Sequence, residues 1–152
     1  MSRFKFLHII LIALCCTVFQ TTTAHAQKDP IEGYWLTEDG NAKIWIYLAK
    51  NGKYYGKIAW MKEPNDVNGN PKLDKENPKE ANRKDPILGL LLLKGFEKDG
   101  DDEYNEGTVY DPKNGKTYSC TITLKSKDKL GVRGYVGVSL LGRTTTWTRT
   151  TQ

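Results

Sequence analysis

Two segments with alternating side-chain character constrain this chain most. Residues 42–49 and Tyr54–Met61 stand on either side of Lys50-Asn51-Gly52-Lys53. In the first segment, apolar residues recur at every second position, which is the period of a β-strand. Asn-Gly is a strong signal for a tight hairpin turn, because both residues tolerate positive φ. The sequence therefore predicts an antiparallel β-hairpin over residues 42–61.

Similar short segments with glycine-rich or Pro/Asn-rich turns follow. They are residues 87–93, 104–110, 117–124, 130–136 and Arg143–Thr150, and a first strand opens at Gly33. Residues 87–93 are the most apolar, and we expect a buried strand there, although a short helix has the same pattern. Gly95 and residues 99–103 are expected in the next turn. The pattern predicts an all-β fold, a single antiparallel up-and-down barrel of about eight strands.

Residues 62–86 interrupt the alternation. Pro64, Pro71, Pro78 and Pro86 occur there among polar and charged residues. We expect one long ordered loop or lid, with a short helical turn near residues 79–82. Loops of this length are often functional, but a plain solvated excursion fits equally well.

The first 26 residues have the layout of a secretory signal peptide. Arg3 and Lys5 precede an apolar run over residues 6–19, and Ala24-His25-Ala26 forms an A-x-A cleavage site. A lipidated or uncleaved anchor is the alternative. Cleavage would export residues 27–152 as one domain to the periplasm or the outside of the cell, with no membrane span left. It would also lower the formal net charge from +5 to +3.

The composition of this mature chain excludes several functions. Both histidines lie in the signal segment, so Ser-His-Asp, Cys-His and histidine–zinc chemistry are not expected. The basic excess is mild and dispersed, which argues against nucleic acid. Cys120 is the one cysteine outside residues 1–26. Its place in an alternating strand favours burial over intermolecular pairing. No cofactor or metal is predicted, and the oligomeric state is open.

Aromatic residues are the main candidates for a binding site. Pockets combine aromatic walls with few polar groups. The candidates are Trp45, Tyr47, Tyr54, Trp60, Tyr110 and Tyr118. Either the Trp45 face or the Tyr54 face of the first hairpin would line the cavity. Ordinary barrel packing is the competing interpretation.

Two weaker patterns point to other chemistry. Residues 66–70 resemble the start of a calcium loop, but Pro71 and Asn77 stand where glycine and glutamate are needed. Glu38 and Asp39 could pair with Arg133, Arg143 or Arg149. No spacing brings two carboxylates together for glycosidase-like catalysis. No catalytic residue is predicted.

Several motifs together resemble a bacterial family of exported proteins, domain-of-unknown-function family 2147. They are Gly33-Tyr34-Trp35, Gly56-Lys57-Ile58, Asn77-Pro78, Pro86-Ile87-Leu88-Gly89, Gly107-Thr108-Val109-Tyr110, Gly115-Lys116-Thr117-Tyr118, Leu130-Gly131-Val132-Arg133-Gly134-Tyr135 and Thr146-Trp147-Thr148-Arg149. The resemblance implies a lipocalin-like barrel of the calycin type and export to the periplasm. It implies no activity.

The calycin pattern also implies how the barrel would close. A Gly-x-Trp on the first strand meets a basic residue of the last strand, whose cation lies over the indole. Here Gly33 and Trp35 would meet Arg149 or Arg143, with Trp147 beside them. We expect a non-catalytic protein that binds a small hydrophobic or amphipathic molecule in its barrel, at the mouth near loop 62–86. The alternatives are an envelope or surface module contacting protein or glycan, and a metal-independent enzyme.

Overall fold

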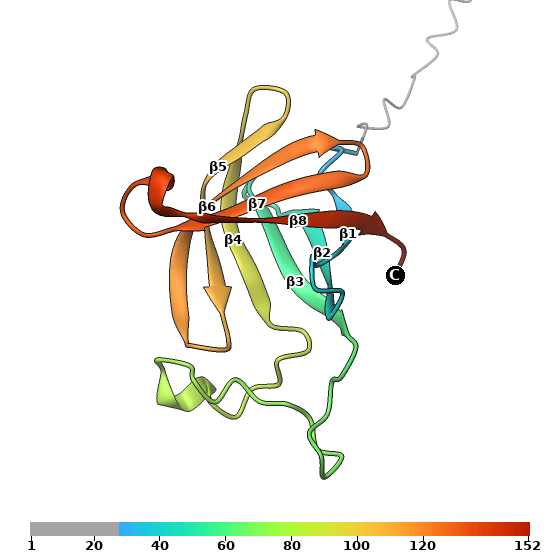
Figure 1. The fold of residues 1–152 in the computed structure, drawn as a ribbon, viewed down its shortest axis with the longest axis vertical. Helices are drawn as coiled ribbons and strands as arrows, with labels where there is room; N and C mark the ends of the chain where they lie inside the picture. The colour runs from blue at the N-terminus through green and yellow to red at the C-terminus, as the bar shows by residue number, and fades with distance from the viewer. Residues whose placement is uncertain (1–27) are drawn as a thin grey trace, which may run out of the picture.

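The computed structural model describes residues 28–152 and folds them into a closed antiparallel β-barrel (Figure 1). Its strands are β1 (Gly33–Leu36), β2 (Ala42–Leu48), β3 (Tyr54–Met61), β4 (Leu91–Asp99), β5 (Glu103–Asp111), β6 (Lys116–Ser126), β7 (Lys129–Tyr135) and β8 (Arg143–Thr150). Each strand pairs with the next, and β1 pairs with β8 to close the barrel. The predicted fold class is confirmed. The predicted signal peptide, residues 1–26, lies outside the described residues.

The predicted hairpin is present as β2 and β3. Tyr47 pairs with Tyr55, and the Ala49 amide donates to the Lys53 carbonyl across the turn at 2.9 Å. Gly52 in that turn has a φ of 78°, which glycine adopts without strain. Ile44 and Ile46 are buried, so the alternation does separate an inner from an outer face.

The prediction for residues 87–93 is wrong in its boundaries. Strand β4 begins only at Leu91 and continues through Gly95 to Asp99. Residues 87–90 form a turn instead, in which the Leu90 amide donates to the Ile87 carbonyl at 3.1 Å. Gly95 has a φ of 76°, so it bends the strand without ending it, and Phe96 beyond it is buried.

The core is one continuous cluster inside the barrel. Its largest fully buried side chains are Trp35, Tyr104 and Phe96. Gly107 leaves room for Phe96, because a Cβ there would lie 2.4 Å from the ring. Cys120 is buried, and desolvation raises the pKa of its thiol to about 12. The thiol is therefore protonated and unreactive at neutral pH.

The up-and-down order gives the barrel two different ends. At the closed end, tight turns join β2–β3, β4–β5 and β6–β7, and Ile31 of the preceding segment is fully buried. The Trp35 indole Nε1 donates to the Ile31 carbonyl at 2.8 Å. At the open end lie the β7–β8 connection and residues 62–90, which extend below the barrel in Figure 1. The latter contain a 3-10 turn, η1 (Glu80–Asn82), close to the predicted position.

Candidate functional site

The closed end is held by a cation over an indole. The Arg149 guanidinium lies 4.1 Å from the centroid of the Trp35 ring, and the two residues are paired across β1 and β8. Arg149 also donates to the Glu32 and Pro30 carbonyls. A Cβ on Gly33 would lie 3.0 Å from the guanidinium, so a larger residue would crowd it. This site is structural.

The two other residues considered for closure lie apart from that contact. Arg143 begins β8 at the open end and is exposed. Trp147 is buried in the core, where its indole donates to the Thr145 hydroxyl at 3.1 Å. Arg149 is thus the residue that covers Trp35.

The six aromatic residues predicted to bind a ligand do not gather in one place. Trp45 and Tyr47 lie on the outer wall, and Tyr54 lies inside near the closed end. Trp60 is 40% exposed at the end of β3. Tyr110 is buried beneath the long loop, and the Tyr118 hydroxyl accepts from Asn114 at 3.0 Å. Their role in binding stays a prediction.

The outer-wall aromatics form a ladder across β1–β3. Tyr34, Trp45, Tyr47 and Tyr55 are in successive ring contacts at centroid distances of 6.3, 4.7 and 6.3 Å. The Lys57 ammonium lies 4.8 Å from the Trp45 ring centroid. Such cross-strand contacts stabilise a sheet. The ladder accounts for the aromatic content of the first hairpin without a cavity.

A partly buried polar cluster attaches residues 29–32 to the closed end. Asp29 accepts from the Tyr104 hydroxyl at 2.5 Å and from the Lys98 ammonium at 2.8 Å. Burial opposes ionisation of Asp29, but the bonds from Lys98 and Tyr104 outweigh it and lower its pKa. Burial beside Asp29 raises the pKa of Tyr54 to about 12. The Asp29 carboxylate is therefore ionised, and the hydroxyls of Tyr54 and Tyr104 beside it stay protonated.

The long loop has its own anchor in the barrel. Asp74 is fully buried and accepts from the Tyr110 hydroxyl and from the Asn77 side-chain amide, both at 2.7 Å. Burial and the bond to Asp74 raise the pKa of Tyr110 to about 12. Gly115 touches the same loop, since a Cβ there would lie 1.9 Å from the Glu76 carbonyl oxygen. Residues 73–77 are thus fixed against the end of β5.

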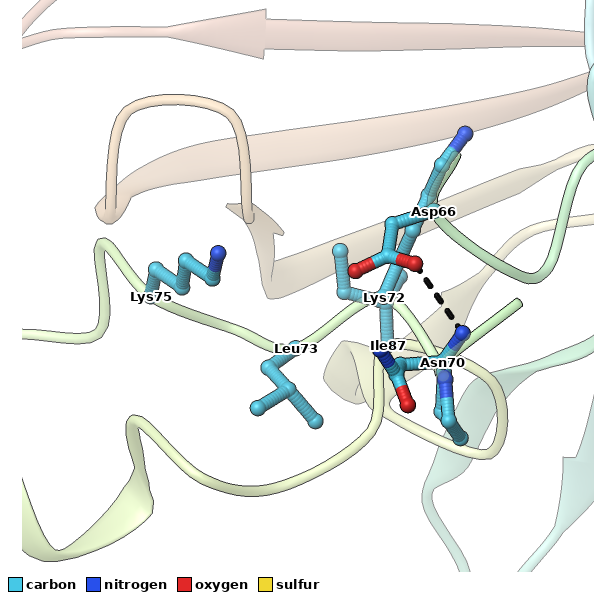
Figure 2. A pocket seen from close by; sticks show the side chains of 7 residues that line it. Asp66, Asn70, Lys72, Leu73, Lys75 and Ile87 are labelled. Atoms are coloured by element: carbon cyan, nitrogen blue, oxygen red, sulfur yellow. Dashed lines mark hydrogen bonds between the residues drawn. The ribbon is translucent and has the colours of Figure 1, made fainter. Parts of the chain in front are cut away.

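Next to this anchor the loop forms a hollow of about 620 Å³ that is open to solvent, here called the loop hollow (Figure 2). Its lining residues are Asp66, Asn70, Pro71, Lys72, Leu73, Lys75 and Ile87. Leu73 and Ile87 supply apolar surface, and Ile87 also packs against the barrel core. Ile87 therefore links the lining of the hollow to the barrel core, although no fully buried core residue lines the hollow.

The charged side chains that line the loop hollow differ in the hydrogen bonds and ion pairs that they already make. Asp66 accepts from the Asn68 and Asn70 amides at 2.9 and 3.0 Å, and the bond from Asn70 is the main reason its pKa is lowered. Lys72 pairs with Glu63 at 3.3 Å. The Lys75 ammonium makes no hydrogen bond or ion pair within residues 28–152, but its charge contributes to the lowered pKa of Asp66. This ammonium is available as a donor to an acceptor that enters the hollow.

A second hollow, of about 590 Å³, lies on the outer wall over β5–β8. It is lined by Glu103, Asn105, Thr121, Thr123, Lys125, Gly131, Arg133 and Thr144. Lys125 lies across Gly131, where a Cβ would be 2.6 Å from its Cε. This surface is polar and has no apolar floor, so the loop hollow is the better candidate for a partly apolar ligand.

Local hydrogen bonds account for the carboxylates of the two weaker sequence patterns, the calcium-like residues 66–70 and the pair Glu38 and Asp39. The Asp66 carboxylate closes its own turn, as the bonds above show. Asp39 accepts from Thr37, and Glu38 accepts from the Thr146 amide at 3.0 Å. Within residues 28–152 no group of three or more metal-ligating side chains comes together. In the same range no helix is long and apolar enough to cross a membrane.

A closed eight-stranded antiparallel barrel with a cation over its first-strand tryptophan defines a lipocalin-like barrel. In agreement, the chain resembles the solved structure of protein HP1028 from Helicobacter pylori, described as belonging to the lipocalin family. The two share 27% identity with a TM-score of 0.66, over 79% of this chain and 82% of that one. The chain belongs to the family DUF2147, described as an uncharacterized protein conserved in bacteria, whose model matches residues 33–149. No curated protein matches it.

Of the residues that line the loop hollow, Asp66, Asn70 and Pro71 were considered only as part of a calcium-like pattern, and Lys72, Leu73, Lys75 and Ile87 were not considered as site residues. Leu73 offered one signal, since it and Val67 are the only large aliphatic residues in the polar stretch 62–86. Their fates differ: Val67 is fully exposed, while Leu73 is half-buried. Asp74 gave no signal, because nothing local distinguishes a buried aspartate from the surface acids around it.

Proposed function

We propose that this protein is a non-catalytic, exported binding protein that takes a small amphipathic acid in the loop hollow. Export depends on the signal peptide expected over residues 1–26, and a mature chain beginning at Gln27 would support it. A chain of the full 152 residues in the periplasmic fraction would contradict cleavage.

The observation that carries the proposal is the anchored hollow at the barrel mouth. Its volume of about 620 Å³ falls in the range of small-molecule pockets. The apolar floor of Leu73 and Ile87 suits a short hydrocarbon segment. Two cations, Lys72 and Lys75, line the hollow against one carboxylate, Asp66, which already accepts two amide hydrogens, so a carboxylate ligand is favoured over an ammonium.

The barrel interior is a poorer place for the ligand. Its closed half is occupied by the continuous buried cluster that includes Trp35, Phe96 and Tyr104. A filled barrel also suits a surface module, the alternative function. That alternative predicts binding to a macromolecule with no effect of small acids.

Titrations of the ¹⁵N-labelled protein with decanoate, decanol and decylamine test the proposal. Decanoate should shift the amides of Leu73 and Ile87, and Lys75→Gln should weaken it about tenfold, the scale of one charge-assisted hydrogen bond. Lys84→Gln is the matched control, because Lys84 is exposed in the same loop but does not line the hollow. Decylamine binding at least as tightly as decanoate, or no shift at Leu73 and Ile87, would overturn the proposal.

A further inference from the structure

The connection between β7 and β8 presents four large apolar side chains to solvent. Val136, Val138, Leu140 and Leu141, here called the apolar tip, are 68%, 60%, 88% and 81% exposed. The tip has ordered backbone: it contains the 3-10 turn η2 (Ser139–Leu141), and the Leu141 amide donates to the Val138 carbonyl at 3.2 Å. In Figure 1 this turn projects from the side of the barrel. None of the four side chains contributes to the buried core.

The charges behind the apolar tip are all of one sign along the chain. No aspartate or glutamate occurs after Asp128, whereas Lys129, Arg133, Arg143 and Arg149 do. Arg143 is exposed directly behind the tip and is paired with Gly134. Arg133 on the neighbouring position of β7 donates to the Thr144 hydroxyl at 2.9 Å. Two carboxylates lie farther back: Glu38 accepts from the Thr146 amide on β8, and Glu103 lines the outer-wall hollow together with Arg133.

Tyr135 completes the arrangement at the base of the tip, where β7 ends. The order from the tip inward is thus aliphatic, then tyrosine, then arginine. This arrangement is typical of segments that insert shallowly into a membrane interface, because aliphatic side chains enter the acyl boundary while tyrosine and cationic side chains stay among the headgroups.

We propose that the apolar tip inserts into the interface of an anionic phospholipid bilayer, with Arg143 at the headgroups. A second copy is disfavoured as the occupant because tip-to-tip contact would bring like charges together. The described chain begins at the closed end, where Ile31 is buried, whereas the apolar tip is at the open end.

Co-sedimentation with vesicles tests the inference. The full chain should bind vesicles of phosphatidylethanolamine and phosphatidylglycerol more tightly than vesicles of phosphatidylcholine. The double substitution Leu140→Ser/Leu141→Ser should weaken that binding about tenfold, and Arg143→Gln should weaken it for the anionic vesicles alone. Leu48→Ser is the control, because Leu48 is 47% exposed at the closed end. Any contribution of residues 1–27 is common to all variants.

Thermal unfolding checks that each variant remains folded, which is expected because the substituted side chains are exposed. Equal binding by the double variant and the Leu48→Ser control would overturn the inference. Loss of self-association in the double variant, measured by sedimentation velocity, without loss of vesicle binding would assign the tip to a second copy instead. Failure here would leave ligand binding in the loop hollow untouched, since the two sites share no residue.

Discussion

Trp35 is the residue on which the closed end depends most. Its ring is fully buried, its indole bonds to the Ile31 carbonyl, and Arg149 covers its face. Asp29 makes polar contacts at the same end, where the Tyr104 hydroxyl and the Lys98 ammonium both donate to its carboxylate. These contacts join the segment before β1 to strands β4, β5 and β8.

Trp35→Ala is expected to lower the free energy of unfolding by about 3–5 kcal/mol, the cost of truncating a large buried aromatic side chain. Urea denaturation measures this loss. Trp60→Ala is the control, since Trp60 is 40% exposed, and its cost should stay below about 1 kcal/mol. A loss below about 1 kcal/mol for Trp35→Ala would show that the indole does not close the barrel.

Asp29→Asn should reduce stability at pH 6 by about 1–3 kcal/mol, because two donors lose their charged acceptor. The pKa of Asp29 is lowered on folding, so its contribution is complete above the unfolded pKa of about 3.9 and is lost as pH falls through the folded pKa. The difference in unfolding free energy between the two proteins should therefore shrink below about pH 4. A difference that stays constant from pH 6 to pH 2 would contradict this assignment.

At the scale of elements, the strands could be predicted where one face is buried and the other is exposed. Strands β2, β3 and β6 have this alternation, and their predicted bounds agree closely with the structure. Strand β4 could not be placed in this way. Ile87 and Leu90 pack against the core from a turn, so burial alone does not distinguish them from a strand. The ordered position of residues 73–77 could not be predicted from the sequence either, because it depends on contacts with Tyr110 and Gly115, which are distant along the chain.

Tyr110→Phe tests whether the long loop is fastened as described. The substitution removes one of the two donors to the buried Asp74 carboxylate, and we expect a loss of about 1–3 kcal/mol. Hydrogen exchange should speed up at amides of residues 72–87, such as Asp74, which donates to Asp85. Tyr118→Phe is the matched control, because the Tyr118 hydroxyl contacts exposed Asn114. Equal exchange in the two variants would show that Asp74 does not anchor the loop.

For the whole molecule, the sequence indicated the closed barrel and its family more readily than the site. Aromatic residues suggested binding, but their positions follow the packing of the barrel: Tyr54 faces the core, while Trp45 joins the outer ladder. The loop hollow arises from contacts between residues 66–75 and Ile87. Short-range patterns do not encode such contacts. The two ends of the barrel therefore differ. The closed end is held by core packing and by the contacts of Asp29 and Arg149, whereas the loop hollow and the apolar tip lie at the open end.

The most direct test of ligand binding is native mass spectrometry of the protein purified from its own host. We expect a co-purifying amphipathic acid on the wild-type protein and on Lys84→Gln. Occupancy should be reduced when Lys72 and Lys75 are both replaced by glutamine. A protein that carries no small molecule, and whose unfolding temperature no lipid or metabolite raises, would contradict ligand binding in the loop hollow, as would a bound molecule unaffected by the double substitution.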